Sequence, residues 1–204
     1  MFCLSYLFEG SNGADGMEKR RIILARHGAT ELNDDGDKIR GWKDVPLNQH
    51  GKDEAEALGD RLKKEDFDFI ISSNLSRAEE TAKIVAKITE KPFVGATQGL
   101  RPWNLGVYTS APATQVMEHM KEYVVDHPDK KVDGGESFND FKNRFFDEVI
   151  KILEKYPDKV PLIVAHHRND RLLDAWKGDK DVDLKTFLSR GITPGQHEIY
   201  YVYV

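Results

Sequence analysis

The chain has 204 residues, of which 39% are hydrophobic and 32% charged, and it carries a formal net charge of −5. This length suits one domain with a sizeable core, and the acidic balance argues against nucleic acid as an obligate partner. The single cysteine, Cys3, excludes an intramolecular disulfide, and no apolar run approaches the roughly 18 residues of a membrane span. We therefore expect a cytoplasmic protein with no membrane partner.

The first sixteen residues differ in composition from the rest of the chain. Residues 1–7 are apolar but lack the basic start of a signal peptide. Residues 10–16 are small and polar, as in a linker. We predict an N-terminal extension or linker over residues 1–16 and one domain over residues 17–204. A strand or packing arm formed by residues 2–8 is the alternative.

Short apolar runs alternate with helical periodicities along the domain. Apolar runs of four to eight residues predict strands, and apolar residues at three- and four-residue steps predict helices. Strands are expected at 21–25, 67–72, 93–94, 161–165 and 198–204, and helices at 48–64, 75–90, 113–125, 137–156 and 172–176. This alternation predicts a three-layer α/β sandwich, a mostly parallel sheet with helices on both faces.

Side chains that can accept a hydrogen bond precede two of these helices. Asn48 can cap the helix that runs to about Lys64, and Ser73 or Asn74 can cap the next one. Arg77 falls in the first turn of that second helix. A guanidinium and a helix N-terminus therefore face the end of the preceding strand together.

Three predicted strands end near residues that suit an anion site. Arg26 and His27 follow the first strand. Arg77 lies just beyond the second, and His166 follows the strand 161–165. Ligands of an open α/β sheet bind beyond the carboxyl ends of its strands, so parallel neighbours would bring two imidazoles and two guanidiniums together. An Arg-His-Gly tripeptide alone fits any surface loop, and the prediction depends on this convergence.

Such a cluster describes a pocket for a small polyanion. Arginine offers a planar fork that matches phosphate oxygens in pairs, and a neutral imidazole is a competent nucleophile. Nearby positive charge disfavours the imidazolium and keeps His27 neutral near pH 7. Cationic side chains can also stabilise a transferring phosphoryl group without a metal. We infer a two-step phosphoryl transfer through a phosphohistidine, with no metal and no cofactor.

Four segments, taken in order, resemble the histidine phosphatase superfamily, which has the phosphoglycerate mutase-like fold. They are residues 24–33, 41–48 with Gly51 and Ala55, 72–82 and 163–166. The resemblance covers nearly all of the predicted domain. It implies that His27 is the phosphorylated nucleophile and that the phosphoryl group is held by Arg26, Arg77 and His166. It also implies a further phosphate contact from Asn33.

Two departures from the superfamily leave the proton donor to the leaving group open. Many members carry a glutamate two residues after a leucine at a position like Leu100, where this chain has Pro102. The acid phosphatase branch has an aspartate directly after its second histidine, where this chain has His167. We hypothesise that His167 or Glu136 donates the proton. Otherwise the enzyme has no such acid and favours good leaving groups.

The sequence therefore predicts a metal-independent phosphate monoester hydrolase that acts on a small phosphorylated metabolite. Phosphoglycerate mutase-type transfer is the second candidate, ranked lower because the usual acid is missing. A catalytically weak phosphate-binding or interaction module is the third. We expect specificity to come from the loops 34–47, 99–135 and 167–195, and no oligomeric state is predicted.

Overall fold

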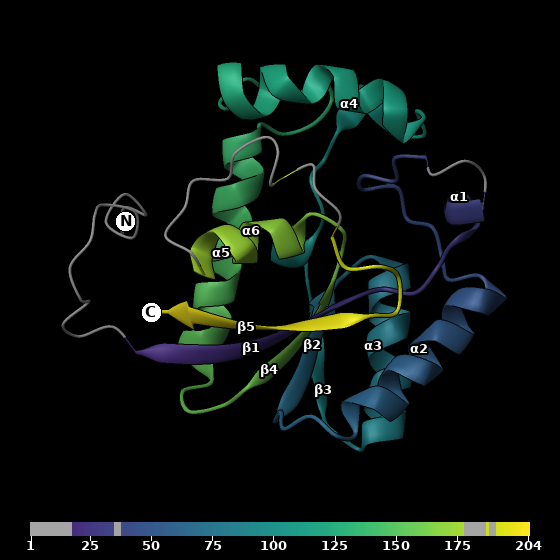
Figure 1. Ribbon diagram of the computed structural model, residues 1–204, viewed down its shortest axis with the longest axis vertical. Helices are drawn as coiled ribbons and strands as arrows, with labels where there is room; N and C mark the ends of the chain where they lie inside the picture. The colour runs from purple at the N-terminus through teal and green to yellow at the C-terminus, as the bar shows by residue number, and fades with distance from the viewer. Residues whose placement is uncertain (1–17, 35–37, 178–186, 188–190) are drawn as a thin grey trace.

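The computed structural model describes residues 18–34, 38–177, 187 and 191–204 (Figure 1). Five strands form one sheet in the order β3-β2-β4-β1-β5. The strands are β1 (Lys19–Arg26), β2 (Phe69–Ser73), β3 (Phe93–Thr97), β4 (Pro161–Ala165) and β5 (His197–Tyr203). The first four are mutually parallel, and β5 runs antiparallel to β1. The extension predicted over residues 1–16 lies outside the described residues.

Helices cover both faces of this sheet, which confirms the predicted three-layer α/β fold (Figure 1). The α-helices are α1 (Glu31–Asp34), α2 (Gln49–Leu62), α3 (Ser76–Thr89), α4 (Ala113–Lys121), α5 (Phe138–Lys155) and α6 (Asn169–Lys177). The helix predicted over 113–125 is α4 followed by a π-helical segment, Glu122–Asp126. Two short 3₁₀ segments, Gln98–Leu100 and Gly106–Tyr108, lie in the loop before α4.

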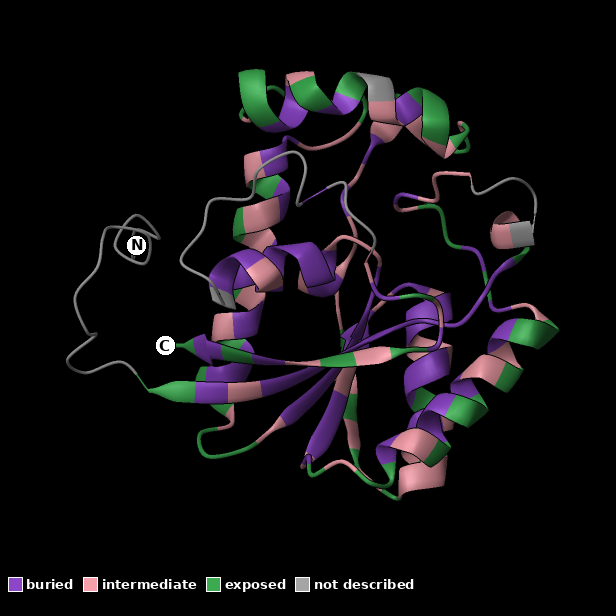
Figure 2. Cartoon of the chain, in the orientation of Figure 1, coloured by how far each residue is buried: buried purple, intermediate pink, exposed green. Residues whose placement is uncertain are grey.

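Buried residues lie along the strands and on the helices that cover them (Figure 2). Alternate residues of β1 contribute to the two parts of the core, one on each face of the sheet. Ile23 packs with residues of α2 and α3, such as Leu58. Leu24 belongs to the larger part, which includes Phe141 and Phe145 of α5. Because successive side chains of a strand point to opposite faces, a strand with helices on both sides is apolar throughout. This burial explains the uninterrupted apolar runs in β1 and β4.

The N-terminus of α2 begins as the sequence predicts, but that of α3 does not. Asn48 caps α2 through its side chain. The cap predicted for α3 at Ser73 or Asn74 is wrong, because the cap position belongs to Leu75, whose side chain makes no capping bond. Asp44 Oδ1 instead accepts a hydrogen bond of 2.8 Å from the amide of Ser76. A carboxylate at this terminus suits the helix dipole and fixes the preceding loop beside α3.

The sheet register gathers the strand ends at one edge. Arg26 pairs with Ala165, so His27 and His166 are the next residues along two neighbouring parallel strands. The amide of His27 donates to the carbonyl of Ala165 at 3.1 Å. β2 pairs with the other side of β4, so the first turn of α3, with Arg77, faces the same edge.

The loop after His27 meets α2 at two glycines. A Cβ on Gly51 would lie 2.0 Å from the carbonyl oxygen of Ala29, and a Cβ on Gly28 would lie 2.2 Å from that of Gly51. Neither backbone oxygen can move away as a flexible side chain could. The position of the loop that follows His27 therefore depends on the absence of a side chain at Gly28 and at Gly51.

We expect Gly51→Ala to destabilise the fold by about 1–3 kcal/mol, because the added methyl group overlaps a backbone carbonyl. Urea unfolding measures the free-energy difference. The neighbouring Lys52→Ala is the control, since it removes only an exposed ion pair with Glu80, worth about 1 kcal/mol or less. Equal stabilities of the two variants would contradict this account of the packing.

Candidate active site

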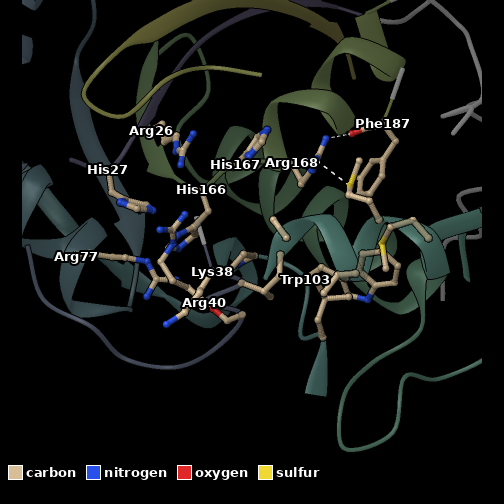
Figure 3. A pocket seen from close by; sticks show the side chains of 18 residues that line it. Arg26, His27, Lys38, Arg40, Arg77, Trp103, His166, His167, Arg168 and Phe187 are labelled. Atoms are coloured by element: carbon tan, nitrogen blue, oxygen red, sulfur yellow. Dashed lines mark hydrogen bonds between the residues drawn. The ribbon is translucent and has the colours of Figure 1, made fainter. Parts of the chain in front are cut away.

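His27 lies directly beyond β1, at the edge where β4 also ends, and its side chain lines a cavity (Figure 3). It is 2% exposed, and its Nδ1 lies 2.7 Å from the carbonyl oxygen of Gly28. A carbonyl oxygen only accepts hydrogen bonds, so Nδ1 carries the proton of the neutral ring. The lone pair is then on Nε2, the nitrogen that can act as a nucleophile.

His166 follows β4, and its ring neighbours that of His27. The ring centroids are 5.0 Å apart, with their planes inclined at 60°. His166 is buried, and neither of its ring nitrogens has a hydrogen-bond partner among the described residues. Buried polar groups in proteins nearly always have partners. The ring therefore offers both a donor and an acceptor to a ligand in the cavity.

Two arginines reach the same edge and are oriented by backbone carbonyls. Arg77 Nη1 donates to the carbonyl of Lys43 at 2.9 Å, and its Nη2 donates to that of Gly41 at 3.1 Å. Arg26 Nη1 donates to the carbonyl of Ile192 at 3.0 Å. Carbonyl groups fix a guanidinium without cancelling its charge. The described residues also provide no hydrogen-bond partner for Nε of Arg77.

Burial and positive charge keep both imidazoles neutral. Burial lowers the pKa of His27 well below its ordinary value, and Arg77, Arg26 and Arg40 lower it further. Burial and then Arg77 do the same to the pKa of His166. Burial, with Arg40 next, lowers the pKa of Arg77 itself to about 9, so this guanidinium stays protonated at neutral pH. Two neutral rings therefore lie beside a permanent positive charge.

A cavity of about 130 Å³ opens over these groups. Its basic part is formed by three histidines and five cations, which are His27, His166, His167, Arg26, Lys38, Arg40, Arg77 and Arg168. Its described lining contains no aspartate or glutamate. Nor do the described residues contain any group of three or more His, Cys, Asp or Glu side chains that could hold a metal ion. The chemistry of this lining suits an anion.

The remainder of the cavity is lined mainly by apolar side chains. Six of them form what we call the apolar wall: Trp103, Leu105, Val116, Met117, Met120 and Phe187. Figure 3 shows Trp103 and Phe187 on the far side of the cavity from His27 and Arg77. Three members of the wall come from α4. The helix predicted over 113–125 thus contributes to the site through α4.

His167 and Pro102 both line the cavity. His167 is partly buried, and no described residue hydrogen-bonds its Nε2. Burial and then Arg168 lower the pKa of His167 to about 3, so this ring is neutral at neutral pH. Pro102 carries no titratable group. Pro102 therefore offers no proton, and the His167 ring carries no positive charge in the cavity.

The other two predicted site residues do not line the cavity. The Glu136 carboxylate accepts hydrogen bonds from Arg144 Nη2 at 2.7 Å and from the amide of Asn104 at 2.9 Å. Asn33 Oδ1 accepts from the amide of Thr30 at 2.9 Å. Glu136 therefore joins distant segments and Asn33 makes a local turn contact, whereas the five other predicted residues meet around the cavity.

Several lining residues lie in the loops 34–47, 99–135 and 167–195, which were expected to give specificity, but the sequence assigned no individual role to them. Lys38, Arg40 and Arg168 add cations to the basic part. Arg40 directly precedes the segment 41–48, and Arg168 lies two residues after His166. Their closeness to segments that resemble the superfamily could have indicated a place in the site. The apolar wall had a weaker signal, because the periodic apolar residues of α4 equally suit an ordinary core face.

An α/β sandwich whose neighbouring strands end at two buried histidines, beside guanidiniums, is the arrangement that the resemblance to histidine phosphatases predicts. A model of the histidine phosphatase superfamily (branch 1) matches residues 22–187. The chain belongs to this superfamily. Among the helices of the described residues, none is long and apolar enough to cross a bilayer.

Several relatives carry phosphatase names. "Uncharacterized phosphatase PhoE" of Bacillus subtilis (strain 168) is 31% identical over 71% of this chain and 70% of its own. The "Metal-independent phosphoserine phosphatase" of Arabidopsis thaliana is 31% identical over 73% of this chain and 65% of its own. Among solved structures, Bacillus stearothermophilus YhfR is 26% identical and covers 88% of this chain and 90% of its own, with a TM-score of 0.73.

The buried neutral rings of His27 and His166 predict that the free energy of unfolding decreases as the pH is lowered. Both pKa values are lowered by folding, so below about pH 6.5 the unfolded chain binds protons that the folded chain does not. From about pH 7.5 to 5.5 the unfolding free energy should fall by no more than about 1–2 kcal/mol for each ring. Urea unfolding at both pH values measures this loss, which His166→Asn should reduce. An identical pH dependence in the two proteins would refute this assignment.

Proposed function

We propose that the protein is a phosphate monoester hydrolase that acts through a phosphohistidine at His27 and requires no metal. The observation that carries the proposal is the orientation of His27. Its Nδ1 hydrogen bond to Gly28 directs the lone pair to Nε2, in a cavity whose basic part includes Arg26 and Arg77. The phosphatase names of relatives support the same class of reaction.

The reaction has two displacements. In the first, His27 Nε2 attacks phosphorus, the P–N bond forms, and the ester P–O bond breaks with its electrons going to the leaving alcohol. In the second, water attacks the phosphohistidine, the P–N bond breaks, and inorganic phosphate and the neutral imidazole are released. Dividing one difficult transfer into two easier steps is the advantage of covalent catalysis.

The cationic lining serves the transition state of both steps. Negative charge is spread over three phosphoryl oxygens while the attacking and leaving atoms lie in line. Arg26 and Arg77 present fixed guanidiniums, and His166 presents ring nitrogens with no other described partner. Donors that are already oriented need no reorganisation during the reaction, so they stabilise the developing charge effectively.

The leaving alcohol departs without a proton from the protein in this proposal. The described cavity lining has no carboxylate, Glu136 is engaged by Arg144, and His167 is neutral at neutral pH. Alcohols that are stable as anions then leave most easily.

Replacing the nucleophile should abolish turnover. We expect His27→Asn to lower the hydrolysis of an aryl phosphate, measured with a metal chelator present, by at least about a thousandfold. Brief exposure of the wild type to labelled substrate should also trap an acid-labile phosphoryl group that the variant lacks. His119→Asn is the matched control, because His119 is exposed and lies outside the cavity lining. Equal rates in wild type and His27→Asn would leave only a phosphate-binding module.

The leaving group should control the rate. Since general acid catalysis contributes roughly 10²–10⁴-fold, we expect phenyl phosphate to be hydrolysed at least about a hundredfold faster than an alkyl phosphate of similar size. His167→Gln and Glu136→Gln should leave this ratio unchanged. A variant that selectively slows the alkyl ester would identify the altered residue as the acid and overturn the acid-free mechanism.

A further inference from the structure

The apolar wall occupies the part of the cavity that the phosphoryl group does not need. The reacting groups lie at the sheet edge, whereas Trp103 and Phe187 of the wall lie across the cavity from them (Figure 3). Val116 and Met120 of α4 are buried, as is Phe187. The organic part of a bound ester extends away from His27 and therefore meets this wall.

The six side chains of the wall themselves offer a ligand almost no hydrogen bonds, and the Arg168 guanidinium beside them already donates to Met117 and to the carbonyl of Phe187. The indole Nε1 of Trp103 already donates to the carbonyl of Glu136 at 3.0 Å. The Met117 sulfur lies 3.9 Å from Nη2 of Arg168 and accepts from it. Leu105, Val116 and Phe187 have hydrocarbon side chains, and the Met120 thioether is only a weak acceptor. Hydroxyl groups of a sugar or glycerol ester would lose their water here without gaining partners, which is unfavourable.

The charge of the cavity excludes another class of substrate. An ammonium group requires a carboxylate or a set of carbonyl acceptors nearby, but the described lining has no carboxylate and five cations. Repulsion between like charges is strong in a site with little water. Phosphate esters of amino acids or amino alcohols therefore fit this cavity poorly.

Resting on the proposed function, we propose that the substrate is a phosphate monoester whose organic part is uncharged and apolar. An aromatic ring or a short hydrocarbon chain packs against Met117, Met120 and Phe187 while the phosphoryl group reaches His27. Methionine suits such a surface because its flexible, polarisable thioether adapts to aromatic and aliphatic groups. A phenol-like alcohol would also be the good leaving group that a site without an acid requires.

Binding of non-hydrolysable phosphonates tests this proposal without turnover. Calorimetry on the wild-type chain should give a dissociation constant that falls about fourfold for each methylene from methyl- to butylphosphonate. Propylphosphonate should bind at least about tenfold more tightly than 2,3-dihydroxypropylphosphonate, which lacks partners for its hydroxyls. 3-Aminopropylphosphonate should also bind more weakly than propylphosphonate. Equal affinities for the propyl and dihydroxypropyl compounds would overturn the proposal.

A substitution in the wall tests whether the wall causes the dependence of affinity on chain length. Met117→Gln should weaken butylphosphonate severalfold while leaving methylphosphonate unchanged, because only the longer chain reaches residue 117. Gln115→Ala, on the exposed side of the same helix and outside the lining, is the control, and thermal unfolding verifies that both variants fold. An unchanged chain-length dependence in Met117→Gln would reject the wall as its cause. Failure of the proposed hydrolase would appear differently, as absent turnover with the chain-length dependence intact.

Discussion

The site depends on positive charge gathered in a cavity whose described lining contains no carboxylate. Desolvation makes such charge unfavourable unless polar groups or a ligand compensate it. Backbone carbonyls of Lys43, Gly41 and Ile192 orient the guanidiniums of Arg77 and Arg26 but leave their charge in place. An anion is the natural complement. The same charge, with burial, keeps His27 neutral and hence nucleophilic, so affinity and reactivity have one physical origin.

Much of the site could be predicted because strand ends are local features of a sequence. The apolar runs of β1 and β4 are visible directly, and the groups that follow them are His27 and His166. Parallel neighbours with right-handed crossovers must then bring those ends together. The orientation of β5 was not predictable, since its alternation of Tyr and Val fits either direction. Its antiparallel pairing with β1 became known only from the structure.

The features that the sequence did not predict share a physical cause, because each depends on contacts between residues far apart in the sequence. Local pattern identified residues able to cap α3, but Asp44, 32 residues before Ser76, takes that role. Glu136 looked available as an acid until its pairing with Arg144 and Asn104 was known. The apolar wall likewise combines segments whose periodicity alone suits an ordinary core. Sequence showed which groups exist, while packing decided which of them meet.

Nitrogen NMR of the histidine side chains tests the central claim most directly. Across about pH 5 to 8, where free imidazoles titrate, the ring of His27 should remain neutral with its proton on Nδ1, as the bond to Gly28 requires. Added vanadate, a phosphoryl analogue, should shift the signals of His27 and His166 together. A His27 ring that titrates near its ordinary pKa, with signals that do not shift when vanadate is added, would contradict the account.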